Sequence, residues 1–212
     1  MNTTGDAFPL TLADRDIADA RDRIRRYCGL PWSGGPPETW AYRYYDATPT
    51  GGPNDVGATD VLATTALHPG LKRSDLAFFY DHRGVLERWL KTIPREASLR
   101  DADDDLIARL DELATWDVPV TLGLLSKVLH RKRPEFVPLL DRHIIDWYRP
   151  VTGERAAQAA WAPLLRRLRG DLGGKNALSL SMLRVGELEK ELANVPSSLR
   201  LVDIAIWMEG RA

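Results

Sequence analysis

The chain has 212 residues, of which 44% are hydrophobic, and its formal net charge at pH 7 is −1. This length and composition predict one globular domain with a sizeable core, and they exclude a disordered chain, which needs low hydrophobicity and high net charge. Because the charges are balanced, any basic surface that binds a nucleic acid has to be local.

The compartment is predicted from three absences in the sequence. The only cysteine, Cys28, cannot form an internal disulfide, and we expect it to be a buried small side chain in a reducing compartment. The N-terminal residues lack the basic start and apolar run of a signal peptide, and no apolar stretch approaches about 20 residues. We therefore expect a soluble, cytoplasmic protein with no membrane partner.

The first quarter of the chain predicts a helix, a connector and a long loop. Apolar residues at helical spacing predict a helix over about 13–28 that ends at Gly29. A connector rich in proline and glycine follows at 31–37, and residues 41–47 fit either a short helix or a strand. The loop 48–58 has about a dozen residues, a length that suggests a functional or mobile role.

The middle of the chain predicts further helices. Two begin at the capping pairs Thr59-Asp60 and Ser74-Asp75, and the second continues to Pro94. A third helix covers about 103–116, and its acidic start suits the positive end of the helix dipole. The alternative, a metal site in this acidic start, lacks the glycine and the closing glutamate of a calcium loop.

The remaining segments are also predicted to be helical. They cover about 120–131, 139–148, 154–170, 176–194 and 197–208. The last of these is strongly apolar, and we expect it to pack against the domain rather than to project as a partner surface. Because no alternating strand pattern of useful length and no internal repeat occurs, the predicted fold class is all-α, a single globular domain of about eight or nine helices.

The segment SKVLHRKRPEFVPLLDRH, residues 126–143, carries the candidate chemistry. Lys127 lies on the polar side of the predicted helix, beside Gly123, whose missing side chain leaves room for a close approach. Asp141 lies in the first turn of the next predicted helix, which starts near Leu139. Asp141 has two interpretations: a partly desolvated carboxylate suited to proton chemistry, or an acid that caps free helix N–H groups.

Basic residues are in local excess around this segment, and they too have two interpretations. The excess can hold a phosphate backbone. It can equally stabilise a helix C-terminus and form salt bridges to the acidic helix upstream. The residues concerned are Lys127, Arg131, Lys132, Arg133, Arg142 and Arg149.

Two families resemble parts of the chain. The segments YRYYDA, TDVLATTAL, SKVLHRKRPEFVPLLDRH and SSLRLVDIAIWM together resemble an uncharacterised bacterial family of unknown function, over about residues 40–208. This first resemblance implies no activity. The second concerns about 25 residues around LGLLSKVLHRKRPEFVPLLDRHI, which resemble the helix-hairpin-helix segment of the DNA glycosylase superfamily.

The glycosylase resemblance assigns roles to individual residues. Gly123 matches the first hairpin glycine, Lys127 the lysine that forms a Schiff base, and Asp141 the aspartate that assists base excision; His143 also has a counterpart. The implied chemistry is attack of Lys127 on the sugar of a nucleotide flipped out of the duplex. The chain departs from the pattern at Leu125, which replaces the second hairpin glycine, in a shorter spacing between lysine and aspartate, and in lacking a four-cysteine cluster.

The sequence thus predicts a DNA-interacting protein that resembles a degenerate helix-hairpin-helix DNA glycosylase, and the alternative is a non-catalytic scaffold or protein-interaction domain. Lys127 and Asp141 are the predicted catalytic residues. The predicted DNA-binding residues are Gly123, Arg131, Lys132, Arg133, Arg142 and His143. The two functions differ in geometry: catalysis needs Lys127 and Asp141 within about 8 Å in one open basic cleft, whereas a capping Asp141 paired with arginine favours the scaffold.

Aromatic residues and histidines could support such a site. Trp40, Tyr44 and Tyr45 are candidates to stack on a flipped base because they adjoin the long loop, although core positions are the simpler interpretation. No metal or cofactor is expected, because the four histidines do not show the spacing of a helical metal site.

Overall fold

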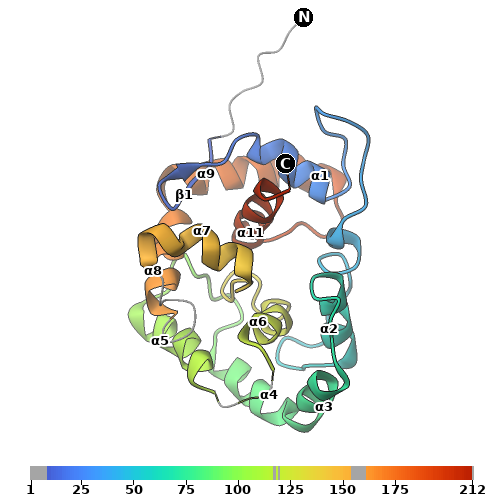
Figure 1. The fold of residues 1–212 in the computed structure, drawn as a ribbon, viewed down its shortest axis with the longest axis vertical. Helices are drawn as coiled ribbons and strands as arrows, with labels where there is room; N and C mark the ends of the chain where they lie inside the picture. Colours follow the sequence, from blue (N-terminus) through green and yellow to red (C-terminus); the bar gives the residue numbers. More distant parts are fainter. Residues whose placement is uncertain (1–8, 117, 119, 154–160, 212) are drawn as a thin grey trace, which may run out of the picture.

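A computed structural model describes residues 9–116, 118, 120–153 and 161–211. These residues form a single, mostly helical globular domain, which confirms the predicted fold class (Figure 1). The α-helices are α1 (Ala20–Tyr27), α2 (Ala58–Ala63), α3 (Arg73–Asp81), α4 (Arg83–Thr92), α5 (Asp104–Glu112), α6 (Leu122–His130), α7 (Arg142–Thr152), α8 (Ala162–Asp171), α9 (Gly174–Leu183), α10 (Glu189–Glu191) and α11 (Ser198–Glu209).

The first predicted helix, over about 13–28, is wrong in its first half. Residues Thr11–Leu12 (β1) pair antiparallel with Arg15–Asp16 (β2), and Ala13 and Asp14 between them have φ values of 52° and 59°. A right-handed helix cannot include such left-handed residues, so α1 begins only after Asp19, whose φ is also positive. Its predicted end is confirmed, because Gly29 has a φ of 72°.

The predicted helix that runs to Pro94 is divided into α3 and α4. The break is at His82, whose backbone angles (φ −105°, ψ 10°) lie outside the helical range and whose ring stacks on Phe78. The predicted caps are shifted as well. Asp60 and Asp75 do not precede their helices; their carboxylates accept the N–H groups of Gly57 (3.0 Å) and Lys72 (2.7 Å) three residues earlier.

Two later helices match their predictions. The acidic segment starts α5 with Asp103 as its N-cap, which accepts the N–H of Leu106 at 2.8 Å, and a 3-10 turn over Leu113–Thr115 completes the predicted span. The apolar C-terminal helix α11 is buried along most of its length and lies between α1 and α7 rather than projecting (Figure 1).

The helix predicted over 176–194 is divided into α9, a π-helical segment Arg184–Leu188, and α10. The first seven residues of the helix predicted over 154–170 lie outside the described residues.

Helix α6 lies near the centre of the domain (Figure 1). Its apolar side joins the main core, but its polar side is buried too: Ser126, Lys127 and His130 are each at most 4% exposed. The polar residues of α6 therefore face other parts of the protein, and this position creates the candidate site.

In the part of the chain that is described, no helix has both the length and the apolar character that a membrane crossing needs.

Candidate functional site

Asp141 is the N-cap of α7. The helix predicted over about 139–148 begins about three residues later than expected, because α7 begins at Arg142. Oδ1 of Asp141 accepts the backbone N–H groups of His143 (2.9 Å) and Ile144 (3.3 Å). The capping interpretation of Asp141 is thus confirmed, and its other oxygen, Oδ2, is left to face α6.

Lys127 and Asp141 meet one of the two conditions of the catalytic prediction: they lie within about 8 Å of each other, but the lysine is buried and does not face an open cleft. Nζ of Lys127 is 4.0 Å from Oδ2 of Asp141, and it also donates to the carbonyl of Gly123 at 3.4 Å. The lysine side chain is only 4% exposed and that of Asp141 is 21% exposed, so the pair lies under the surface with its acidic end at the edge. Burial lowers the pKa of Lys127, and the charges of Asp141 and Asp203 partly oppose this effect.

Gly123 allows α6 to approach the chain that leads into Asp141. A Cβ atom at this position would lie 3.0 Å from the carbonyl oxygen of Leu140, closer than ordinary contacts allow. The predicted close approach at Gly123 therefore exists, and its partner is backbone of the same chain. This approach brings Lys127, one helical turn later, into reach of Asp141.

The basic residues that end α6 point into the protein. Arg131, Lys132 and Arg133 are each at most 9% exposed. The guanidinium of Arg131 donates to the carbonyls of Tyr45, Thr48 and Pro49. That of Arg133 donates to the carbonyls of Leu90, Ile93 and Pro53 and to the side chain of Asn54. Through these hydrogen bonds, the two arginines hold the loop 48–58 against the end of α6.

Asp60 completes this attachment from α2. It is fully buried, and its carboxylate lies 2.5 Å from Nζ of Lys132 and 3.3 Å from Nε of Arg131. The alternative prediction for the basic residues, salt bridges within the protein, is confirmed for these two. Their partner is Asp60, however, and the predicted acidic helix upstream is not involved. A charge this deeply buried is stable only with such partners.

Arg142 and His143, the other predicted DNA-binding residues, lie exposed at the start of α7. The Arg142 side chain is 91% exposed, and its Nε lies 3.3 Å from Asp146 one turn later. His143 lies beside the end of α11, with its ring centroid 6.4 Å from that of Trp207. An exposed basic start of α7 therefore adjoins Asp141.

Aromatic and basic groups continue this surface, which we name the tryptophan–arginine surface: Trp40, Arg142, His143, Trp207 and Arg211. Trp40 and Trp207 are half-buried and meet edge to face, with centroids 5.4 Å apart. The exposed guanidinium of Arg211 lies 3.7 Å over Trp207. Neither Trp207 nor Arg211 was predicted as a site residue, and Arg211 lies just beyond the end of α11.

The other two candidates for base stacking differ from each other. Tyr45 is a core residue, 1% exposed, and its hydroxyl donates to the backbone carbonyl of Lys127 at 2.6 Å. Tyr44 is 56% exposed. Tyr45 is thus hydrogen-bonded to the backbone of the candidate lysine and is not available for stacking.

Cys28 is buried as expected, and burial raises the pKa of its thiol to about 12.

A buried ionic network behind Lys127 was not predicted. Arg200 of α11 donates to both oxygens of Asp46, at 2.7 and 3.0 Å, to Oδ2 of Asp203, and to the hydroxyl of Tyr27. The sequence of the helix 197–208 did not indicate this network, because the helix is apolar apart from its two charged residues, Arg200 and Asp203, and its serines. Their spacing of three residues was the available signal.

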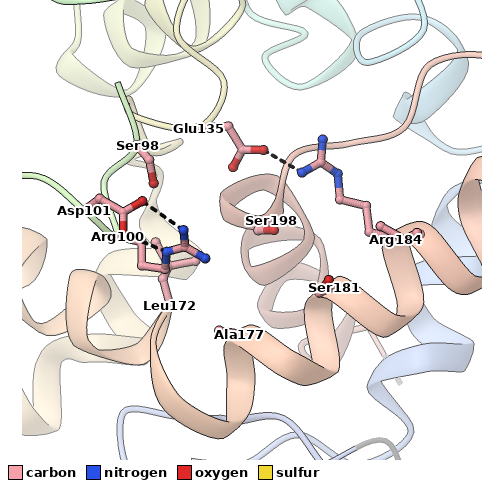
Figure 2. Close-up of a pocket in the computed structure, with 10 residues that line it drawn as sticks. Ser98, Arg100, Asp101, Glu135, Leu172, Ala177, Ser181, Arg184 and Ser198 are labelled. Carbon is pink, nitrogen blue, oxygen red and sulfur yellow. Dashed lines mark hydrogen bonds and ion pairs between the residues drawn. The ribbon is translucent and has the colours of Figure 1, made fainter. Parts of the chain in front are cut away.

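Two cavities are lined in part by residues at the start of α11. The larger, about 470 Å³, is lined in part by Asp46, His130 and Arg200. The smaller, about 250 Å³, is shown in Figure 2, where serine side chains of α9 and α11 lie between two ion pairs. These pairs are Arg184–Glu135, at 2.8 Å, and Arg100–Asp101, at 2.9 Å. Because both arginines already have acidic partners, this smaller cavity provides no unbalanced charge for an ionic ligand.

Comparison with known proteins gives the family and no more. No curated protein and no solved structure matches the chain. One family does, and the match covers residues 20–210, which include the whole corner between α6 and α7. The resemblance to an uncharacterised family of unknown function is thereby confirmed, whereas no match supports the resemblance to the glycosylase superfamily. The chain belongs to DUF6308, a family of unknown function.

Proposed function

We propose that this protein interacts with DNA and that Lys127 and Asp141 form a base-excision site of the kind implied by the glycosylase resemblance. The observation that carries the proposal is the 4.0 Å separation between the lysine Nζ and the aspartate Oδ2. An amine and a carboxylate at this distance can act on the same sugar carbon.

The environment of each group suits its role. Burial lowers the pKa of Lys127, which increases the fraction of neutral amine available to attack the sugar C1′. As the base departs with the electron pair of the glycosidic bond, positive charge develops on the sugar, and the Asp141 carboxylate stabilises it. Because Asp141 is the more exposed of the two, the sugar approaches from the side of Asp141.

The tryptophan–arginine surface supplies the contacts to DNA in this proposal. Arg142 and His143 are exposed directly after Asp141, Arg211 is exposed over Trp207, and all three can contact phosphates. Stacking of unpaired bases on tryptophan or on a guanidinium plane contributes about 1–3 kcal/mol per base. We thus assign phosphate and base contacts to the start of α7 and the end of α11, with Arg131, Lys132 and Arg133 supporting the site from inside.

A second candidate function is a non-catalytic scaffold or protein-interaction domain. The observation that favours it is the internal use of Arg131, Lys132 and Arg133, whose side chains are committed to the loop 48–58 and to Asp60. In this case the same corner stabilises the fold, and Asp141 serves only as the N-cap of α7.

Binding to DNA over a salt series separates the two functions. The probe is a duplex that contains an abasic site, with the intact duplex as its control. DNA interaction predicts binding whose logarithm falls linearly with the logarithm of salt concentration, with a slope of roughly 0.9 per phosphate contacted. Absence of binding to either duplex at low salt would reject the DNA proposal and leave the scaffold.

A further inference from the structure

The larger of the two cavities has a buried interior and an exposed opening. The buried residues that line it come from three separate segments and include Tyr45, His130, Arg131, Ser197 and Arg200. The exposed residues at its opening are Pro49, Thr50, Pro134 and Asn194. Its volume of about 470 Å³ lies in the range of small-molecule sites, about 300–1,000 Å³. A solute can therefore enter from the opening and reach charged groups that the fold otherwise keeps from water.

The buried charges around this cavity are not balanced. The cations are Arg131, Lys132, Arg133 and Arg200, and the carboxylates in contact with them are Asp46, Asp60 and Asp203. Asp60 is shared by Arg131 and Lys132, and Arg133 has no carboxylate partner in the part of the chain that the structure describes. Four cations and three carboxylates leave an excess of one positive charge, which costs free energy in a buried position unless an anion accompanies it.

Near neutral pH this excess is larger than one charge. Burial raises the pKa of Asp203 to about 7, so about half of the molecules carry a neutral Asp203 at that pH. The other ion pair of the lining, Arg184 with Glu135 at 2.8 Å, adds no net charge. A phosphate monoester carries about −1.5 to −2 at pH 7 and matches this excess, whereas a carboxylate supplies only one negative charge.

Two guanidinium groups in the lining retain an N–H group for a ligand. Each guanidinium has five N–H groups. Arg131 uses four of them, on Asp60 and on three backbone carbonyls. Arg200 also uses four, on two carboxylates and on the hydroxyl of Tyr27. In both arginines, one N–H of Nη1 is left without a partner among the residues that the structure describes.

His130 adds a hydrogen-bond acceptor to the same lining. Its Nδ1 lies 2.6 Å from the carbonyl oxygen of Val137 and therefore donates. Burial lowers the pKa of the ring to about 4, so the ring is neutral near pH 7 and Nε2 carries a lone pair. The lining thus combines N–H donors and excess positive charge with one neutral acceptor, which can bind a ligand hydroxyl.

We propose that this cavity binds a small molecule that carries a phosphate group and at least one hydroxyl group. The phosphate accepts the unused N–H groups of Arg131 and Arg200 and supplies the missing negative charge, while the hydroxyl donates to Nε2 of His130. Sugar phosphates have both groups. Duplex DNA is not the occupant, because Arg131 and Arg200 are only 9% and 3% exposed, too deep for the backbone of a duplex. The inference goes beyond the proposed function and does not depend on it.

NMR of the His130 ring tests the proposal. The probes are ribose 5-phosphate, inorganic phosphate and ribose, each added to the full-length protein at constant ionic strength. We expect a saturable shift of the His130 ring signals with both phosphates, with a Kd for inorganic phosphate on the order of 1 mM and tighter binding of ribose 5-phosphate. Ribose alone should bind at least about tenfold more weakly than ribose 5-phosphate. The ring of His82, which does not line the cavity, should not respond.

A pair of variants at Ala47, which also lines the cavity, tests the role of charge. Ala47→Glu adds a carboxylate to the lining and should weaken the binding of inorganic phosphate at least about tenfold. Ala47→Gln has the same size without the charge and should retain binding within about threefold. Circular dichroism checks that both variants fold, and the titrations of the wild type do not depend on them.

Three results would overturn the proposal. The first is the absence of a saturable shift at His130 with either phosphate up to about 50 mM, well above the expected Kd. The second is equal binding of ribose and ribose 5-phosphate, or equal binding of phosphate by folded Ala47→Glu and Ala47→Gln, because the charge is then not recognised. The third is binding of inorganic phosphate without binding of ribose 5-phosphate, which would leave a site for a free ion only.

Discussion

Lys127 Nζ lies 4.0 Å from Asp141 Oδ2, and this contact depends on Gly123, one helical turn before the lysine. Because Gly123 has no side chain, α6 approaches the carbonyl of Leu140, and the N-cap of α7 then meets the lysine. The same aspartate thus caps a helix and faces an amine. These two roles can be separated by substitution.

Asp141→Ala removes both the cap and the charge, whereas Asp141→Asn retains a good N-cap. We expect Asp141→Ala to destabilise the protein by about 1 kcal/mol, within a range of roughly 0.5–2, and Asp141→Asn to cost less. Urea unfolding measures both. Thr121→Ala, which removes the cap of α6, is the matched control. Equal losses for the alanine and asparagine variants of Asp141 would mean that its charge, and not its cap, stabilises the corner.

Asp60→Asn should be among the most destabilising single substitutions, because it leaves Lys132 and Arg131 buried without their carboxylate. Breaking a buried ion pair from one side typically costs about 3–5 kcal/mol. The double variant Asp60→Asn/Lys132→Met should recover part of this loss in urea unfolding. The exposed Asp146→Asn serves as control and should change stability by about 0.5 kcal/mol or less. A similarly small loss for Asp60→Asn would contradict the proposed attachment of the loop.

Two buried groups have opposite effects on stability between about pH 4 and 6.5. Burial lowers the pKa of His130 from 6.5 to about 4, so the unfolded chain binds the extra proton and stability rises with pH. Burial raises the pKa of Asp203 from 3.8 to about 7, so the folded chain binds the extra proton and stability falls with pH. In the wild type the two slopes, each at most about 1.4 kcal/mol per pH unit, should largely cancel.

Variants at these two positions separate the pH dependence of stability due to His130 from that due to Asp203. Relative to the wild type, Asp203→Asn should gain stability as the pH rises through this window, and His130→Asn should lose it. Urea unfolding at about pH 4.5 and about pH 6.5 measures the difference. Parallel pH profiles for the wild type and both variants would show that neither group changes its protonation on folding.

The tryptophan–arginine surface is tested by the salt dependence of DNA binding. Arg142→Ala and Arg211→Ala should each weaken binding and reduce the salt slope by about 1, because each removes one phosphate contact. Arg100→Ala, beside the cavity in Figure 2, is the control and should leave the slope unchanged. If all three variants bind like the wild type, DNA does not contact this surface.

Periodicity predicted most of the helices but could not locate backbone reversals. Ala13 and Asp14 fit an amphipathic helix by spacing, yet both adopt positive φ to form the turn between β1 and β2. His82 similarly interrupts an apolar pattern that continues across it. Such breaks depend on tertiary packing, which overrides local preference.

The candidate pair was predictable because Gly123 leaves room beside Lys127, and because Asp141 lies where the next helix starts. What those signals omit is the direction in which a charged side chain points. Arg131, Lys132 and Arg133 look like a surface patch in sequence, and only the path of the loop 48–58 turns them inward. Asp203 was missed because burial, rather than spacing, makes it chemically unusual.

Borohydride trapping on abasic duplex DNA tests the proposed chemistry most directly, because it captures a covalent bond between the amine and the sugar. We expect a trapped complex with the wild type and none with Lys127→Met, while Asp141→Asn traps more slowly. The labelled peptide should contain Lys127. No trapped complex with the wild type at any pH, or equal trapping by Lys127→Met, would contradict a base-excision site at Lys127 and Asp141.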